Sequence, residues 1–204
     1  MMRRLWGRLS SVNVQKAVWA LDEAELAYER LDAGGAFGVV REPAYRTMNP
    51  NGLVPTLEED GFVLWESNAI MRYVASLSPA LAPPIDPRQR AHIDQWLDWQ
   101  ATSFTPAMRD AFWQLFRSAD PNRTLIAASL AASEVYAAIL DGHLAGRDYA
   151  VGESFSIADI ALGCAAHRWL NLPAERQDRP NLRRWYERIA VRPGAARALA
   201  EPVG

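Results

Sequence analysis

Two different spacings of hydrophobic residues divide the first 78 residues of the chain into short elements. After Asn13, apolar residues recur every three or four positions, which is the spacing of one face of an amphipathic helix. Shorter apolar runs without that spacing lie between turn residues and predict strands. In order, the pattern predicts a strand at 3–9, a helix from 13 to about 26, a strand at 28–32, a glycine-rich loop at 33–42, strands at 55–58 and 62–65, and a helix at 66–77.

A proline-rich segment then interrupts the pattern. Residues 78–87 contain four prolines, which can neither continue a helix nor pair within a sheet, so the segment is predicted to be a linker. Every later segment has helical spacing, and helices are predicted at 88–117, 125–144, 156–169 and 181–191. The predicted fold is therefore an α/β domain at residues 1–78, a linker at 79–87 and an all-helical domain at 88–204.

Composition narrows the class of protein. Half of the 204 residues are hydrophobic and 23% are charged, which is typical of a globular chain. The net charge of −2 argues against a nucleic-acid partner, because phosphate contacts need a basic field. The single cysteine, Cys164, cannot form an internal disulfide, which favours a reducing, cytoplasmic compartment. The apolar runs are too short to predict a secretory signal or a membrane-spanning segment.

The turn Ser10-Ser11-Val12-Asn13 lies between the first predicted strand and the first helix. A helix N-terminus has unpaired N–H groups and a partial positive charge, so hydroxyl or amide donors there can stabilise a thiolate or another anion. The same residues are also ordinary helix caps, and capping is the favoured interpretation of this motif in isolation.

Two further motifs lie at element ends. In the segment from Asn49 to Pro55, a cis bond before Pro55 would expose the backbone N–H and C=O of Val54 to a peptide-like ligand; an ordinary trans proline at the start of a strand is the simpler alternative. Glu66 and Ser67 lie where a strand ends and a helix begins, where they could hold an ammonium and a carboxylate, or simply cap the helix.

These motifs, at successive element ends of one unit, resemble those of the glutathione transferase superfamily, in particular its bacterial, serine-type, theta-, zeta- and nu-like members. The resemblance is carried by Asn-Pro-x-Gly-x-Val-Pro-x-Leu at residues 49–57 and by Leu-x-Glu-Ser-x-Ala-Ile-x-x-Tyr at residues 64–73. It continues to Ser156-Ile-Ala-Asp159, which is similar to the family's buried capping box, and so spans nearly the whole chain. It implies a thioredoxin-like β-α-β-α-β-β-α domain followed by a helical bundle.

The resemblance also implies a site for glutathione as co-substrate. Val54 and Pro55 would bind the cysteinyl backbone of the tripeptide, Glu66 and Ser67 its γ-glutamyl end, and a hydroxyl in the first turn its sulfur. A bacterial Thr-Pro-Asn pattern favours Ser11 with Asn13 for the sulfur, whereas a zeta-like Ser-Ser-Cys pattern favours Ser10. Asn51 stands where many relatives carry lysine, which leaves the contact with the glycine end open.

Departures from the family pattern exclude some mechanisms. No tyrosine precedes Tyr28, so a tyrosine-type mechanism is not expected, and Val12 replaces the cysteine of zeta-like members. Cys164 lies in an apolar helix and is interpreted as core. His92, His143 and His167 match no metal-ligand spacing, so no metal is expected. The wall of an electrophile pocket is expected from Met108, Arg109, Phe112, Trp113 and Phe116, for which ordinary core packing is the alternative.

The resemblance thus implies a homodimeric transferase that conjugates glutathione thiolate to hydrophobic electrophiles. Two alternatives remain open at this point. One is a glutathione-dependent disulfide oxidoreductase or isomerase that works with bound glutathione. The other is a non-catalytic relative that serves as a protein-interaction module.

Overall fold

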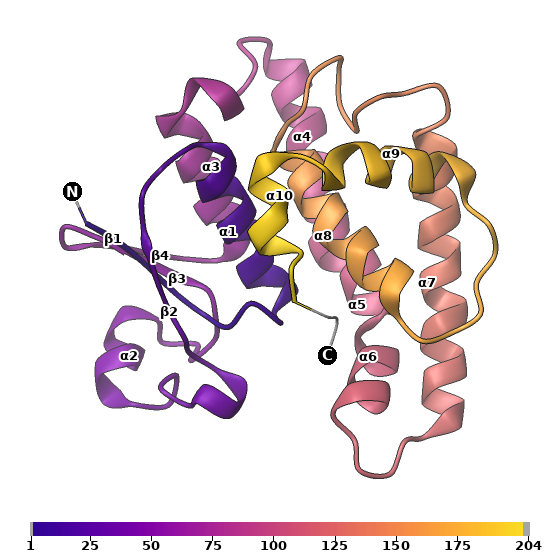
Figure 1. Cartoon of the computed structure of the whole chain (residues 1–204), viewed down its shortest axis with the longest axis horizontal. Helices are drawn as coiled ribbons and strands as arrows, with labels where there is room; N and C mark the ends of the chain where they lie inside the picture. The colour runs from indigo at the N-terminus through magenta and orange to yellow at the C-terminus, as the bar shows by residue number, and fades with distance from the viewer. Residues whose placement is uncertain (1, 202–204) are drawn as a thin grey trace. The chain divides into compact units, whose positions relative to one another are not determined.

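The computed structural model describes residues 2–201, and these fall into two compact units. The first unit runs up to Pro83 and also includes Arg192–Glu201; the second is Pro84–Val191 (Figure 1). The sequence pattern placed residues 88–204 together in the helical domain. In the structure, Arg192–Glu201 belongs with the first unit instead.

The first unit is built on a four-stranded mixed sheet. Its strands are β1 (Arg3–Trp6), β2 (Glu29–Leu31), β3 (Thr56–Glu59) and β4 (Phe62–Trp65), in the order β2-β1-β3-β4. β1 pairs with β2 in parallel, whereas β1 with β3 and β3 with β4 are antiparallel. Leu5 lies opposite Leu57 in the register, and both are fully buried. This is the expected thioredoxin-like sheet.

Up to Pro83, the first unit also contains the helices α1 (Val12–Glu23), α2 (Pro43–Met48) and α3 (Ser67–Leu77), with short 3-10 turns η1 (Gly35–Phe37) and η2 (Pro79–Leu81). Of these helices, α1 and α3 bury an apolar face. Nine of the ten residues from Val12 to Leu21 are buried, and α1 packs against both α3 and α10 (Pro193–Ala198). The sequence spacing did not place α2, but the β-α-β-α-β-β-α order implied by the resemblance includes it, and it begins with Pro43 in its first turn.

The last helix is clamped onto α1 by close packing and by charge. A Cβ at Gly194 would lie 2.8 Å from the backbone nitrogen of Glu23, so only glycine allows this approach. The Arg192 guanidinium forms an ion pair with the nearly buried carboxylate of Glu23, and Arg197 pairs with Asp22 at 3.5 Å. The sequence around α10 has no helical spacing of apolar residues, so this helix was not predicted.

The second unit is entirely helical over the residues that the structure describes. Its elements are α4 (Pro87–Trp99), a π-helical turn η3 (Gln100–Phe104), α5 (Thr105–Ala107), α6 (Arg109–Phe116), α7 (Arg123–His143), α8 (Ile157–Asn171) and α9 (Pro180–Ala190). α8 forms the centre of the unit, since almost all of its residues are buried.

The prediction of one helix over 88–117 was wrong. Pro106 has no N–H and cannot donate to the carbonyl four residues earlier in a continuing helix. Just upstream, the Thr102 hydroxyl donates to the carbonyl of Asp98 at 2.8 Å, which competes with the backbone pattern. The chain therefore passes through the wide turn η3 and resumes as α6.

The predicted capping box at the start of α8 is confirmed. Ser156 accepts a hydrogen bond from the backbone of Ala158, and Asp159 reaches back to the Ser156 backbone at 3.0 Å. The Asp159 carboxylate also accepts the N–H of Ala150 at 2.7 Å and the indole N–H of Trp185 at 2.9 Å. Burial raises the pKa of Asp159 to about 6, although these donors favour its ionised form. One side chain thus ties the preceding loop, α8 and α9 together.

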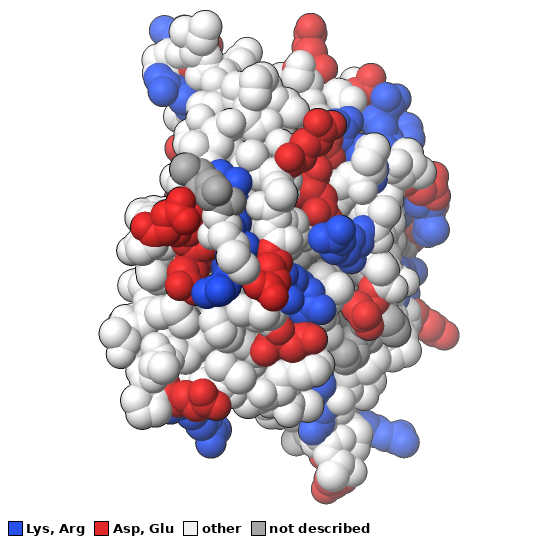
Figure 2. Space-filling model, turned by 60° about the vertical axis from the view of Figure 1, so that its left-hand side comes forward, with Lys and Arg blue, Asp and Glu red and all other residues white. Residues whose placement is uncertain are grey.

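The sequence pattern predicted no segment able to cross a membrane, yet α7 is long and apolar enough to do so by length and composition alone. The same properties suit a helix of a folded bundle. α7 packs into the helical unit through Ser133, Ala137 and Leu140, while Val135 and Ile139 are exposed. On the face drawn in Figure 2, acidic and basic side chains are interspersed, without a single-sign patch.

Candidate active site

The N-terminus of α1 presents a hydroxyl that the helix does not use. Ser11 has an extended backbone (φ −92°, ψ 120°), and its carbonyl accepts the N–H groups of Val14 and Gln15, each at 2.9 Å. Its side chain makes no capping hydrogen bond. The capping interpretation of this motif therefore does not hold for the Ser11 side chain. Ser10 precedes it in the turn and is also partly exposed.

Two side-chain bridges join the N-terminal turns of α1 and α3. The Ser67 hydroxyl donates to Oδ1 of Asn13 at 3.2 Å, and the Lys16 ammonium donates to Oδ1 of Asn68 at 2.8 Å. Lys16 is the only lysine of the chain and is 1% exposed. The bridges bring two helix N-termini and a buried positive charge to one place, which suits anionic groups of a ligand. Lys16 and Asn68 were not among the predicted site residues.

Glu66 directly precedes α3 in a backbone conformation that few residues other than glycine adopt. Its φ is +72°, at a cost of roughly 1–3 kcal/mol. The carbonyl of Glu66 accepts the N–H of Ile70 at 2.9 Å, but its exposed carboxylate makes no capping hydrogen bond. Glu66 therefore has a strained backbone and an exposed carboxylate that does not cap α3. Such strain is typical of ligand-binding positions.

The bond between Val54 and Pro55 is cis, which excludes the trans proline that was the simpler interpretation of the motif. The Val54 side chain lies close to two glycines: a Cβ at Gly7 would be 3.3 Å from Cβ of Val54, and one at Gly34 would be 3.4 Å from its Cγ1. Gly7 also lets the first turn approach α1, because its Cβ would meet Val14 at 2.4 Å.

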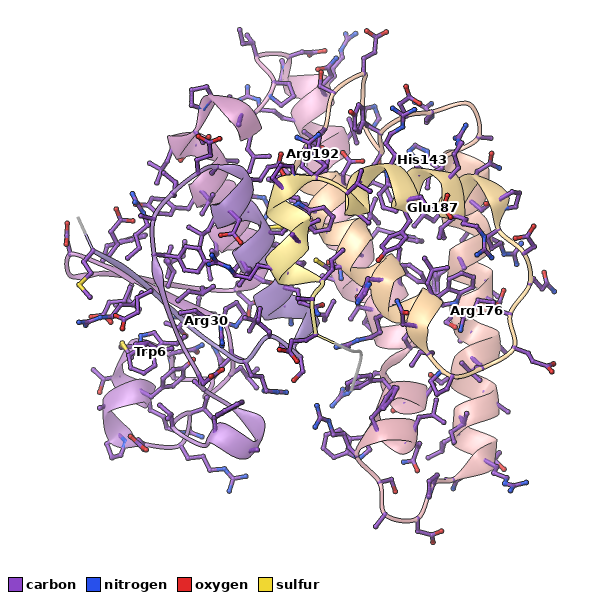
Figure 3. The ribbon with its side chains drawn as sticks, in the orientation of Figure 1. Trp6, Arg30, His143, Arg176, Glu187 and Arg192 are labelled. Atoms are coloured by element: carbon purple, nitrogen blue, oxygen red, sulfur yellow. The ribbon has the colours of Figure 1, made fainter. Side chains whose placement is uncertain are left out.

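A buried polar network holds the loop that carries Val54. The Tyr45 hydroxyl donates to the carbonyl of Leu53 at 2.7 Å and lies 2.9 Å from Oγ1 of Thr56. The amide of Asn49 donates to the same two oxygens, at 3.0 and 3.1 Å. Burial raises the pKa of Tyr45, so its hydroxyl stays protonated as a donor. Trp6 packs edge-on against Tyr45 beside α2 (Figure 3).

These supporting residues were missed because their role depends on contacts between α2 and the loop. Only Asn49 lay in a recognised motif. Asn51 belongs to the same turn: its backbone N–H and its side-chain amide both donate to Oδ1 of Asn49 at 3.1 Å. That bonding fixes the turn and leaves the Asn51 carbonyl oxygen as its remaining side-chain acceptor.

The candidates for an electrophile pocket divide by exposure. Met108 is fully buried within the helical unit, which favours the core interpretation for it. Phe112 packs under the guanidinium of Arg168, which lies 4.0 Å from the ring centroid. Trp113 is 59% exposed and Arg109 is also exposed, so these two can meet a ligand. Cys164 is fully buried, in agreement with its interpretation as core.

Two family models match the chain. They are described as glutathione S-transferase, N-terminal domain, over residues 1–76, and glutathione S-transferase, C-terminal domain, over residues 104–193. Glutathione S-transferase GstB of Escherichia coli strain K12 is 37% identical over 207 residues, which cover 99% of this chain and 100% of that protein. Probable glutathione S-transferase GSTF2 of Oryza sativa subsp. japonica is 27% identical and covers 97% of this chain and 95% of its own length.

Solved structures give the same match. A theta class glutathione S-transferase from Xanthomonas axonopodis pv. citri, with glutathione bound, is 43% identical with a TM-score of 0.95, over 99% of both chains. Glutathione transferase F7 from Populus trichocarpa has a TM-score of 0.88 at 24% identity, which supports the fold alone.

Proposed function

The chain belongs to the glutathione S-transferase family, and from this premise we propose that Ser11 and the N-terminus of α1 hold the sulfur of bound glutathione as a thiolate. The resemblance found in the sequence is thereby confirmed. The enzyme uses glutathione as co-substrate and conjugates it to electrophiles. The observation that carries the assignment is the Ser11 hydroxyl, which stands at a helix N-terminus and makes no capping bond.

The hydrogen bond from Ser11 and the N-terminus of α1 can together stabilise a thiolate enough to lower the pKa of the bound thiol by about two units. A free thiol has a pKa of about 8.5, and lowering it by about two units requires roughly 2.7 kcal/mol of selective stabilisation of the anion. A hydrogen bond to a charged acceptor contributes about 1.5–3 kcal/mol, and a helix N-terminus contributes about 0.3–1 kcal/mol when exposed and up to about 2 kcal/mol when partly buried. The buried Lys16 ammonium adds positive potential at the same helix.

The γ-glutamyl end of glutathione has an ammonium and a carboxylate, and the start of α3 offers a partner for each. We assign the ammonium to the Glu66 carboxylate, and the carboxylate to Ser67 together with the N–H groups of the first turn of α3. The Ser67 hydroxyl can donate one hydrogen bond, and without a ligand it donates that bond to Oδ1 of Asn13. Binding a carboxylate through this hydroxyl therefore releases Asn13, whose amide can then turn toward the sulfur. Val54 pairs with the cysteinyl backbone of glutathione, next to Pro55.

The test compares Ser11→Ala with Ser10→Ala and Asn13→Ala in the conjugation of an aryl halide. We expect Ser11→Ala to lower kcat/KM by about 10²-fold, as expected from about 2–3 kcal/mol of lost anion stabilisation, and Ser10→Ala to stay near wild type. Unchanged rates for Ser11→Ala would remove the assignment. Reduction of a mixed disulfide, measured in parallel, distinguishes conjugation from glutathione-dependent reductase activity.

We further assign hydrophobic electrophiles to the exposed side chains of α6. Trp113 supplies apolar surface and Arg109 a charge nearby, whereas Met108 is left out because it is buried. Trp113→Ala is expected to raise KM for the aryl halide and to leave KM for glutathione unchanged. Equal effects on both KM values would contradict a role in electrophile binding.

We propose that the enzyme is a cytoplasmic homodimer. Exposed apolar side chains on β4 (Phe62, Trp65) and on α7 (Val135, Ile139) supply apolar surface that a second copy can cover. Sedimentation should give a dimer for the wild type and a monomer for Val135→Glu combined with Ile139→Glu. A monomeric wild type would refute the proposal. Fractionation of the native host tests the location.

A further inference from the structure

A cavity in the helical unit lies apart from every residue assigned above. Its volume is about 320 Å³, and it is formed by α4, the last turn of α7 and the loop that follows α7. The side chains that give it chemical character are His92, Gln95, Trp96, His143 and Arg147. The spacing of the histidines in the sequence matched no metal-ligand pattern and predicted no site. In the structure, His92 of α4 and His143 of α7 line the same cavity.

The cavity is basic although the chain as a whole is slightly acidic. His92, His143 and Arg147 can each carry a positive charge, and none of the residues that line the cavity is acidic. Three arginines of this unit form ion pairs, among them Arg188 with Asp148 at 2.9 Å. Arg147 forms no ion pair with any residue in the described range 2–201. Its charge is therefore available to a ligand.

Hydrogen bonds fix how the two imidazoles are protonated. Nε2 of His143 donates to the carbonyl of Ala150 at 2.7 Å, because a carbonyl can only accept, so Nδ1 gains the second proton (His143 is labelled in Figure 3). Nδ1 of His92 donates to the amide oxygen of Gln95 at 3.2 Å. The His143 ring also packs against Trp96, with centroids 4.4 Å apart.

The charges around His143 disfavour its protonation when no anion is present. Burial lowers the pKa of His143, and repulsion by Arg147 and His92 lowers it further, against the hydrogen bond to Ala150. Three charged groups on α7, α8 and α9 near this cavity already have hydrogen-bond partners. These are Arg184 of α9, bonded to the carbonyls of Leu144 and Arg147, Asp159 of α8, which accepts the N–H of Ala150, and Asp141 of α7, which accepts the N–H of Leu182.

We propose that this cavity binds a small multivalent phosphate anion, such as pyrophosphate, with Arg147 as the permanent charge and His143 as the group that takes up a proton on binding. A guanidinium and two imidazoles that line one cavity match an anion of more than one charge better than a single carboxylate. The side-chain amide of Gln95 supplies an uncharged donor to the same anion. Affinity should therefore rise as the pH falls through the range in which histidine titrates.

The chain has only three histidines, so NMR of histidine-labelled protein resolves the test. The probe is pyrophosphate, titrated from about pH 5 to about pH 8 at constant ionic strength, with acetate as the monovalent control. Saturating pyrophosphate should raise the pKa of His143 by about one unit. His167, whose Nδ1 lies 2.6 Å from the Tyr186 hydroxyl outside the cavity, should not respond.

Variants separate this site from general charge attraction. Arg147→Gln should weaken pyrophosphate binding by about tenfold, whereas Arg188→Gln, which removes a surface charge already paired with Asp148, should leave it unchanged. The proposal is overturned by an absence of saturation, by equal shifts with acetate, or by equal effects of the two variants. Aryl halide conjugation, assayed on the same samples, should be unchanged by Arg147→Gln, so failure of this site and failure of the transferase assignment are distinguishable.

Discussion

Replacing Gly194 with alanine tests how the last helix is attached to α1. The added methyl carbon would lie 2.8 Å from the backbone nitrogen of Glu23, 2.8 Å from its Oε2 and 3.0 Å from its Cα. Two of these atoms belong to the backbone of a buried helix and cannot move aside as a side-chain end can. α10 must therefore shift away from α1, which also strains the ion pair between Arg192 and Glu23.

The cost follows from two opposing effects. Overpacking of this kind destabilises by about 1–3 kcal/mol. Alanine has a better helix propensity than glycine, by up to about 1 kcal/mol. The net expectation is a loss of about 1–2 kcal/mol in the free energy of unfolding.

Gly142 in α7 provides a matched control. A Cβ there meets no atom within 4 Å, so Gly142→Ala should stabilise by about 0.5–1 kcal/mol through helix propensity alone. Urea unfolding, followed by circular dichroism, gives both values. Hydrogen exchange of α1 and α10 localises the effect, and only Gly194→Ala should accelerate it. If Gly194→Ala is as stable as the wild type, the close packing of α10 on α1 is refuted.

Two further predictions concern the loop that carries Val54 and the cavity around His143. Tyr45→Phe removes the hydrogen bonds of the Tyr45 hydroxyl with Leu53 and Thr56, so we expect the free energy of unfolding to fall by about 1–2 kcal/mol. We also expect a higher KM for glutathione at nearly unchanged kcat. An unaltered KM would contradict the role of this network. Because the folded state lowers the pKa of His143, its contribution to stability is complete above about pH 6.5 and is lost as the pH falls. In buffers without phosphate, the stability difference between the wild type and His143→Gln should therefore shift against the wild type on acidification, and a difference independent of pH would refute this.

The predicted strands and most helices could be read from the sequence because they depend on local spacing. The strand at 62–65 was predicted at its observed bounds, and the capping box at Ser156 was recognised from four residues. The break in the helix after Trp99 could not be placed by apolar spacing, which continues through it. α10 escaped prediction because it is held by the packing of Gly194 and by ion pairs, and apolar periodicity contributes little to it.

Part of the candidate site could also be predicted, because some of its residues lie in local sequence motifs. Ser11, Val54 and Glu66 stand at element ends within recognisable motifs, and the structure gives each a conformation that leaves side-chain or backbone groups to a ligand. Tyr45 and Lys16 act through contacts with residues far along the chain, and such contacts leave no local pattern. The cavity around His143 has the same origin.

The most direct measurement is the ultraviolet difference spectrum of glutathione bound to the wild type and to Ser11→Ala, recorded as a function of pH. Thiolate absorbance in the wild type should appear with a pKa about two units below that of the free thiol, which is about 8.5. Ser11→Ala should move that pKa upward by at least about one unit, as the loss of one hydrogen bond to an anion requires. A bound thiol that titrates alike in both proteins would contradict the assigned role of Ser11 in holding the sulfur as an anion.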